Sequence, residues 1–410
     1  MYFDSFANAF GGIIKIALES AWVWGPIGLL VLAWELWLTY VRREYLNSLK
    51  WALLEVRLPR EIYKSPLAME LVLSTAFYQT GGVGNWMQKY WQGNLPIWFS
   101  LEMVSIGGEV RFFIRTQEKF KIVIQSQIYA QYPEVEIIDA EDYTDNVPEF
   151  TKGGEWNLFG TEFLLTKADP YPIKTYVDYG LDKSIGSLDE EQRIDPLTSV
   201  MEFLGSVGSG EQAWIQIIIR PSNWGRYPDK ESQFALKKWQ DVGQDLIKEL
   251  NEKWQKPQKD TTAPSRLTKG QQEVLNAIER SLDKFGFDTG IRAIYLARSE
   301  NFNPAQIAAL TGALRQFNSN TLNGFRPNNV TGHDFPWQDM FGDKLIGLKK
   351  DMLEAYKLRS YFYPPYVRKP ILLTTEELAT IFHFPGTVSS TPTLQRMDSK
   401  KAEPPRDIPI

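Results

Sequence analysis

The sequence contains no cysteine, and it has only two histidines, His333 and His383, among its 410 residues. Without cysteine the chain can have no disulfide scaffold, thiol nucleophile or thiolate metal site, and two histidines argue against a poly-histidine metal site. The chain also lacks a strong charge of one sign, and its net charge of −5 argues against a polycation that coats nucleic acid. With 43% hydrophobic residues, the composition is otherwise that of an ordinary globular protein.

Sequence motifs of common enzymes are missing as well. The chain has no GxxxxGK[ST] phosphate loop, no HExxH and no GxSxG. The glycine-rich stretch 205–210 lacks the lysine of a phosphate loop, and we interpret it as a helix end and a turn. His333 is placed in a solvated loop, and His383 is expected to cap the end of a helix. We therefore predict a protein that is not an enzyme, with no catalytic, cofactor-binding or metal-binding residues.

One long apolar segment lies near the N-terminus. As a helix, residues 21–41 would span about 31 Å, close to the thickness of a bilayer's hydrocarbon core. Aromatic residues favour the headgroup region and basic residues favour the cytoplasmic side. Both kinds occur at the ends of this segment: Trp22, Trp24, Trp37, Tyr40, Arg42 and Arg43. We predict a single-pass anchor in the inner (cytoplasmic) membrane, with the N-terminus outside and the C-terminal bulk in the cytoplasm. A cleaved signal peptide or a buried globular helix containing Glu35 is the alternative.

The remainder of the chain alternates between strand and helix patterns. Between residues 51 and 150 the order is βαββαβ, with a hairpin signal at Gly107-Gly108. This order predicts a ferredoxin-like domain, in which one antiparallel sheet carries two helices on one face. The predicted strands are 51–59, 97–108, 109–116 and 135–143, and the predicted helices are 66–81 and 117–133.

The same order can be traced a second time between residues 151 and 385. The predicted strands are 159–167, 212–221 and 290–298, and the predicted helices are 195–207 and 304–317. Two segments, 323–327 and 370–374, are alternative candidates for the last strand. Two long helices, 229–254 and 269–285, interrupt the pattern and predict a helical-hairpin insertion at 229–285.

The predicted fold class is therefore α+β, with four parts. Residues 1–50 hold the transmembrane helix, and residues 7–20 before it form either an interfacial helix or a poorly ordered tail. Two tandem ferredoxin-like (βαββαβ) domains follow at 51–150 and 151–385, the second with the helical insertion. Residues 386–410 are polar and rich in proline, which is typical of an extended connector.

Basic and aromatic residues alternate between positions 344 and 369, a composition that can hold single strands by phosphate contacts and base stacking. Strand 109–116 predicts a second basic and aromatic face. The candidate nucleic-acid contacts are Lys349, Lys350, Lys357, Arg359, Tyr361, Arg111, Phe113 and Arg115. The alternative, which we favour, is that the aromatic turn packs on the second domain while its lysines stay in water, and that this domain covers the strand face.

Acidic residues without a basic neighbour run from Glu134 to Glu149. Such a run could bind a cation or dock a basic partner. We favour a solvated edge strand, because charges on an edge guard against pairing with another sheet.

Five segments together carry a resemblance to a known family. They are 64–77 (KSPLAMELVLSTAF), 98–116, 130–144, 375–386 and 391–410. They resemble the uncharacterised membrane-anchored region associated with conjugative, type IV secretion-like ATPases of the bacterial HerA–FtsK superfamily. The resemblance implies a non-catalytic accessory or scaffold of an ATPase that translocates DNA or protein, with the ATPase either on an adjoining domain or on a separate partner.

The partners implied by this resemblance are membrane lipid, a HerA/FtsK-like ATPase, DNA and further copies of the same chain. The implied homo-oligomer is a hexamer. The alternative function is a membrane-tethered protein that binds single-stranded nucleic acid through the basic and aromatic residues.

Overall fold

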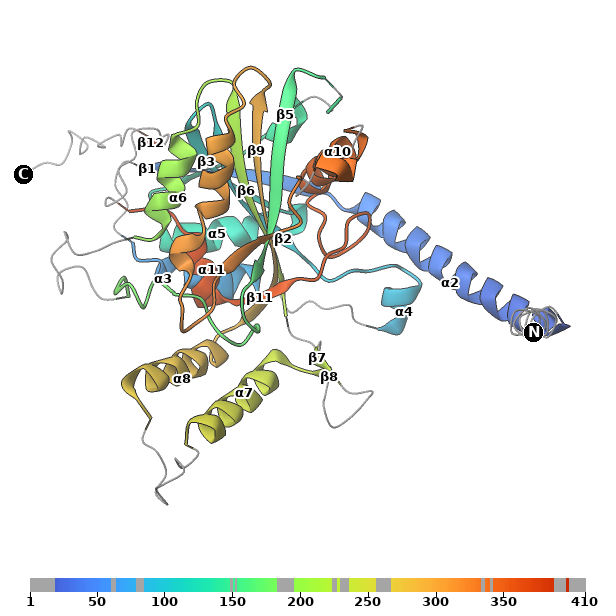
Figure 1. The fold of residues 1–410 in the computed structure, drawn as a ribbon, viewed down its shortest axis with the longest axis horizontal. Helices are drawn as coiled ribbons and strands as arrows, with labels where there is room; N and C mark the ends of the chain where they lie inside the picture. The colour runs from blue at the N-terminus through green and yellow to red at the C-terminus, as the bar shows by residue number, and fades with distance from the viewer. Residues whose placement is uncertain are drawn as a thin grey trace, which may run out of the picture. The chain divides into compact units, whose positions relative to one another are not determined.

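The computed structural model describes most of the chain. The described residues are 19–59, 64–78, 85–147, 150–151, 153–182, 195–222, 227–228, 236–255, 267–332, 336–339, 342–386 and 396–397. Contacts divide the chain into two units, residues 1–50 with 81–97, and residues 51–80 with 98–410. The fold is α+β: the first unit contains an N-terminal apolar helix, and the second contains a large sheet that is almost wholly antiparallel (Figure 1).

The first unit is built on helix α2 (Ala21–Ser48), which has 28 residues and includes Pro26 in its first turns. The predicted span 21–41 lies wholly within this helix. A short helix, α4 (Trp86–Tyr90), belongs to the same unit. The predicted segment 7–20 lies outside the described residues except for its last two positions.

The second unit is built on a ten-stranded sheet with the order β10-β5-β9-β6-β2-β3-β1-β12, in which β4 also pairs with β1 and β11 with β9. The strands are β1 (Trp51–Pro59), β2 (Phe99–Ile106), β3 (Glu109–Gln117), β4 (Glu136–Asp139), β5 (Trp156–Leu165), β6 (Glu211–Pro221), β9 (Gly286–Arg298), β10 (Phe325–Asn328), β11 (Ile371–Thr374) and β12 (Arg396–Met397). Every pair is antiparallel except β1 with β12. A separate two-stranded sheet pairs β7 (Tyr227–Pro228) with β8 (Leu236–Lys237).

The sheet has the same pairing order on both sides of its centre. One half has the order β4-β1-β3-β2 and the other has β10-β5-β9-β6. Strands β2 and β6 join the halves along their length, from Phe99 opposite Ile219 to Ile106 opposite Gln212. One continuous sheet therefore crosses the predicted boundary at residue 150, and the division into tandem ferredoxin-like domains stays a prediction.

Helices cover both faces of this sheet. Ser105 on β2 donates a hydrogen bond to Leu204 on α6, whereas the neighbouring Val104 packs in a cluster with α10. Since successive residues of a strand point to opposite faces, α6 and α10 lie on opposite sides, and α3, α5 and α11 gather on the side of α6 (Figure 1). The helices are α3 (Leu67–Val72), which continues as a π-helical turn η1 (Leu73–Phe77), α5 (Lys121–Gln131), α6 (Leu197–Gly205), α9 (Pro304–Gly312), α10 (Asp343–Lys357) and α11 (Thr375–Ile381).

Several local predictions are confirmed by this structure. Gly107 and Gly108 form the turn between β2 and β3, and their φ angles of +60° and +91° lie in the region that favours glycine. The stretch 205–210 ends α6 and leads into β6, as expected. Both candidates for the last strand are strands: β10 pairs with β5, and β11 pairs with the beginning of β9.

The predicted insertion contains two helices that contact each other, α7 (Trp239–Trp254) and α8 (Lys269–Leu282). Their cluster of buried side chains includes Leu250, Val274 and Ile278. The polar linker between the helices lies outside the described residues, as do His333 and most of the predicted connector.

Candidate functional site

Helix α2 is the feature of the first unit with the clearest functional meaning. Its Trp24–Ser48 part is long and apolar enough to cross a membrane. Within this part, only 11% of the most apolar 18-residue stretch is buried inside the protein. Leu29 and Leu30 are 68% and 71% exposed. A helix that presents this much apolar surface matches a lipid environment by length and composition.

The predicted anchor residues lie towards the two ends of this helix. Trp22 and Trp24 are 79% and 66% exposed near its start. Towards its end, the rings of Trp37 and Tyr40 lie 6.3 Å apart, and the basic pair Arg42–Arg43 follows within the same helix.

A second aromatic group, which the sequence analysis missed, lies against the end of α2. Trp37 donates a hydrogen bond of 3.0 Å from its Nε1 to the carbonyl oxygen of Tyr90. The Tyr90 ring lies 5.9 Å from Trp34, and the Trp91 ring lies 5.7 Å from Trp37. The available signal was the aromatic spacing of residues 86–91 (WMQKYW), in a stretch that carried no predicted element.

In the second unit, the predicted nucleic-acid contacts do not form an exposed surface. Arg359, Tyr361 and Phe113 are 1%, 2% and 2% exposed. These three side chains are buried rather than presented to a partner, and nucleic-acid contact at these positions stays a prediction. The physical reason for their burial is that each fills the interior on the α10 side of the sheet, where the Phe113 ring lies 4.9 Å from the ring of Tyr143.

Arg359 is held by two carboxylates. Its Nε lies 2.9 Å from Oε1 of Glu102, and its Nη1 pairs with Asp142. Burial alone would raise the pKa of Glu102, but the charge of Arg359 and hydrogen bonds from Arg359, Ser100 and Tyr143 hold that pKa below its ordinary value. Glu102 therefore stays ionised in the interior as the partner of the guanidinium.

Glu102 is one member of a row of polar side chains that runs across the sheet. Gln216 lies opposite Glu102 at the β2–β6 junction and donates to it at 3.2 Å. Arg292 lies opposite Gln216, donates to its oxygen at 3.2 Å, and reaches Glu162 on β5 at 3.1 Å. This polar row connects the two halves of the sheet through side chains as well as through the backbone.

The aromatic turn after α10 covers this polar row. The Ser360 carbonyl oxygen accepts from Arg292 at 3.1 Å, and the Arg292 guanidinium lies 5.0 Å from the centre of the Tyr366 ring. Tyr361 lies directly over Gly290, where an added Cβ would come within 2.5 Å of its ring. The turn thus packs on the sheet, as the favoured alternative to nucleic-acid contact expected.

The other predicted basic contacts are scattered. Lys350 is exposed, and the Nζ of Lys357 donates to the Val147 carbonyl oxygen at 3.1 Å. Arg111 pairs with its neighbour Glu109 at 2.8 Å. The Arg115 guanidinium lies 4.5 Å from the centre of the Trp51 ring, and burial lowers its pKa to about 10. The structure therefore does not bring these side chains together into one basic patch.

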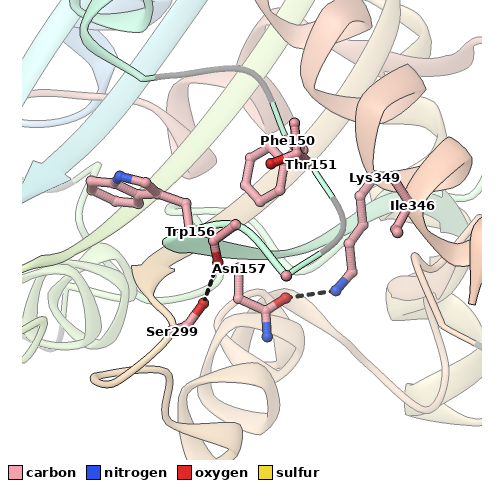
Figure 2. Close-up of a pocket in the computed structure, with 9 residues that line it drawn as sticks. Phe150, Thr151, Trp156, Asn157, Ser299, Ile346 and Lys349 are labelled. Carbon is pink, nitrogen blue, oxygen red and sulfur yellow. Dashed lines mark hydrogen bonds between the residues drawn. The ribbon is translucent and has the colours of Figure 1, made fainter.

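The remaining predicted contact, Lys349, lines a pocket of about 210 Å³ beside α10 (Figure 2). Its Nζ points towards Asn157 and donates to Oδ1 at 2.6 Å, and burial lowers its pKa. Ser299 closes another part of the wall by a bond of 3.0 Å to the Gly154 carbonyl oxygen. The pocket is smaller than the roughly 300–1,000 Å³ of usual ligand sites, and its one lysine is already hydrogen-bonded.

A second group of ion pairs, in which the carboxylates are buried and the cations partly exposed, joins the insertion to the helices on the other face of the sheet. Lys284, just after α8, pairs with Glu70 on α3 at 2.8 Å, and Arg280 pairs with Glu376 on α11 at 3.0 Å. The next residue, Glu377, caps α11: it accepts from the backbone N–H of Thr374, and burial raises its pKa to about 7.

His383 caps α11 at its other end, as predicted. Its Nδ1 lies 2.8 Å from the Ala379 carbonyl oxygen, and its Nε2 lies 3.1 Å from Oδ2 of Asp195. Both ring nitrogens thus face oxygen atoms, one of the α11 backbone and one of the Asp195 carboxylate. Burial would raise the pKa of Asp195, but the charge of His383 lowers it.

The fold and the exposed apolar helix together define an α+β protein with a candidate membrane anchor. Residues 42–397 match the family model described as a domain of unknown function, DUF8128, and the chain belongs to this family. No curated protein matches the chain. The matched region begins at the basic pair that ends the apolar part of α2. In the part of the chain that the structure describes, no group of three or more His, Asp or Glu side chains could hold a metal ion.

Proposed function

We propose that this protein is a membrane-anchored, non-catalytic scaffold for a HerA/FtsK-like ATPase that translocates DNA or protein, as in type IV secretion and conjugation. The observation that carries the membrane part is the exposure of helix α2. Burying a leucine side chain is worth about 1.5–3 kcal/mol, and Leu29, Leu30 and Leu32 are all more than half exposed on α2. Lipid would remove this apolar surface from water.

The direction of the anchor follows from charge. Arg42, Arg43 and Lys50 lie after the apolar part of the chain's long helix, and basic residues favour the cytoplasmic side of a span. The proposed arrangement in the inner membrane therefore has the N-terminus outside and the sheet in the cytoplasm, where an ATPase would meet its nucleotide.

The sheet suits a scaffold because its interior charges are engaged in structural pairs. Arg359 is held by Glu102, and Arg292 by Glu162. We propose that the two halves are tandem ferredoxin-like units fused edge to edge, because both have the same pairing order. A continuous sheet tied together by a buried polar row would form a stiff mount between the membrane and a motor.

The ATPase itself, the hexamer of this chain and the contact with transported DNA rest on the family resemblance of segments such as 64–77 and 375–386. The ATPase partnership is tested with the full chain, produced in a bacterial cell together with a HerA/FtsK-like ATPase of the same organism. We expect the ATPase to sediment with the membrane when the full chain is present. A matched chain in which Leu29, Leu30 and Leu32 are all replaced by arginine should leave the ATPase in the soluble fraction.

Two results would overturn this proposal. One is an ATPase whose distribution between membrane and soluble fractions is the same with both chains. The other is ATP hydrolysis by the purified full chain alone, because that would contradict its non-catalytic role.

A further inference from the structure

Helix α4 presents apolar side chains to its surroundings, although it belongs to the unit built on α2. Trp86, Met87 and Trp91 are 66%, 53% and 56% exposed, and the Trp86 and Trp91 rings lie 6.4 Å apart. Two indole rings and a thioether form more apolar surface than a five-residue helix would leave in water without a partner.

This segment is fixed to the end of α2 by specific contacts. The bond from Trp37 to the Tyr90 carbonyl oxygen is one of them. A second is Gly93, whose φ of +68° lies in the left-handed region and where an added Cβ would come within 2.3 Å of the Val41 carbonyl oxygen. Leu38 and Val41 are the buried hydrophobic residues among the described part of α2, at 7% and 6% exposure. The α4 segment is therefore fixed at one position along helix α2.

The position of Trp37 along α2 corresponds to the edge of a bilayer. Trp37 precedes Arg42 by five positions, which is about 8 Å along a helix at 1.5 Å per residue. The headgroup layer on each side of the hydrocarbon core is roughly 5–8 Å thick. Tryptophan and tyrosine rings favour this layer. If α2 spans the membrane and Arg42 lies at its aqueous boundary, the residues bonded to Trp37 lie in the headgroup layer.

The charge of the segment fits the same position. Lys89 is exposed on α4, and its Nζ lies 5.2 Å from the centre of the Tyr90 ring. Arg42 and Arg43 add positive charge at the end of the apolar run. Cations beside indole rings are suited to lipid phosphates above acyl chains.

We infer that α4 and Trp91 form an interfacial foot, residues 86–91, that inserts into the headgroup layer of the bilayer spanned by α2. The occupant of this surface is phospholipid rather than a second protein, because the surface is continuous with the span and is held to it by Trp37 and Gly93. This inference rests on the proposed anchoring by α2. It adds a second attachment, which would limit how freely α2 tilts and rotates in the membrane.

The absence of cysteine makes a direct test possible. The full chain with a single substitution, Met87→Cys, Leu29→Cys or Glu300→Cys, is labelled with a nitroxide and reconstituted in vesicles of phosphatidylethanolamine and phosphatidylglycerol. Collision with oxygen reports lipid, and collision with a water-soluble nickel chelate reports water. Glu300 is exposed on the sheet unit and gives the value for water, whereas Leu29 gives the value for the hydrocarbon core.

We expect the label at Met87 to collide with nickel severalfold less often than the label at Glu300. Its oxygen collisions should be more frequent than at Glu300 and less frequent than at Leu29. Replacing Trp86 and Trp91 by serine in the Met87→Cys chain should raise its nickel collisions. Nickel access at Met87 equal to that at Glu300, with Leu29 still in lipid, would overturn the foot and leave the anchor standing. If the label at Met87 collides with both nickel and oxygen less often than the label at Glu300, protein covers it, and this would also overturn the foot. Nickel access at Leu29 would overturn the anchor itself.

Discussion

The guanidinium of Arg359 lies against the carboxylate of Glu102, with 2.9 Å between Nε and Oε1, although the two residues are 257 positions apart in the chain. Arg359 ends the helical region of α10 with a φ of +50°, in the left-handed region that non-glycine residues seldom adopt. Glu102 lies in the middle of β2, beside the junction of the two halves. This pair therefore connects the end of α10, which packs on the sheet, to the strand at the centre of the sheet.

Removing the cation of this pair should strongly destabilise the sheet unit. In an Arg359→Met chain Glu102 would stay buried without its main partner, and breaking a buried pair in this way costs about 3–5 kcal/mol. The matched control is Lys248→Met, which removes an exposed pair with Asp245 and should cost less than about 1 kcal/mol. Denaturant unfolding of both chains in detergent measures the difference. Equal, small losses would contradict the structural role given to Arg359.

The packing of the aromatic turn on the polar row predicts an effect of a single methyl group. Gly290→Ala would place its Cβ within 2.5 Å of the Tyr361 ring, and overpacking of this kind costs about 1–3 kcal/mol. Gly347 on α10 has nothing within 4 Å of an added Cβ, so Gly347→Ala should stabilise the helix by up to about 1 kcal/mol. Opposite shifts of the unfolding temperature are expected. A neutral Gly290→Ala would mean that Tyr361 does not lie over that strand.

Glu377 predicts a pH dependence of stability. Burial raises its pKa to about 7, above the ordinary value of 4.5. Between these values the folded chain keeps a proton that the unfolded chain releases, so the free energy of unfolding falls as the pH rises, by up to about 1.4 kcal/mol per pH unit. The contribution is complete below pH 4.5 and is lost as the pH rises through 7.

The matched variant for this prediction is Glu377→Gln, which cannot titrate. The difference in unfolding free energy, variant minus parent, should become more positive between pH 4.5 and 7.5. A difference that does not change with pH would contradict the raised pKa.

Single-stranded nucleic acid provides a test of the alternative function. Lys344 and Lys350 are exposed on α10, whereas Arg359 and Tyr361 are buried. Because Arg359 and Tyr361, which the predicted interface needs beside these lysines, are buried, we expect Lys344→Glu with Lys350→Glu to leave the affinity for a single strand unchanged. The measurement is the affinity as a function of salt concentration. A fall in affinity, with a salt slope smaller by about 1 for each lysine, would restore the nucleic-acid interface.

The local parts of this fold could be predicted because their signals are close together in the sequence. Gly107-Gly108 marks a hairpin, which the structure confirms. Thr374 and Glu377 have the spacing of a capping box, and the structure forms one at the start of α11. Glu136 and Asp139 on β4 are exposed, as expected for a solvated edge, whereas Asp142 of the same acidic run pairs with the buried Arg359. Each of these features depends on residues only a few positions apart.

The junction of β2 with β6 could not be predicted in this way. Its polar pair, Glu102 and Gln216, comes from two strands that are otherwise largely apolar, and nothing local reveals that the two lie opposite each other. The burial of Arg359 was missed for the same reason. The available signal was the lone charge of Glu102 in a buried strand, because such a carboxylate needs a cationic partner.

The central claim is that α2 holds the chain in a membrane, and extraction of cell membranes with alkaline carbonate tests it most directly. This treatment releases peripheral proteins and leaves spanning proteins in the pellet. We predict that the full chain stays in the pellet, and that the chain with Leu29, Leu30 and Leu32 replaced by arginine is released. Release of the unaltered chain into the supernatant would contradict the account.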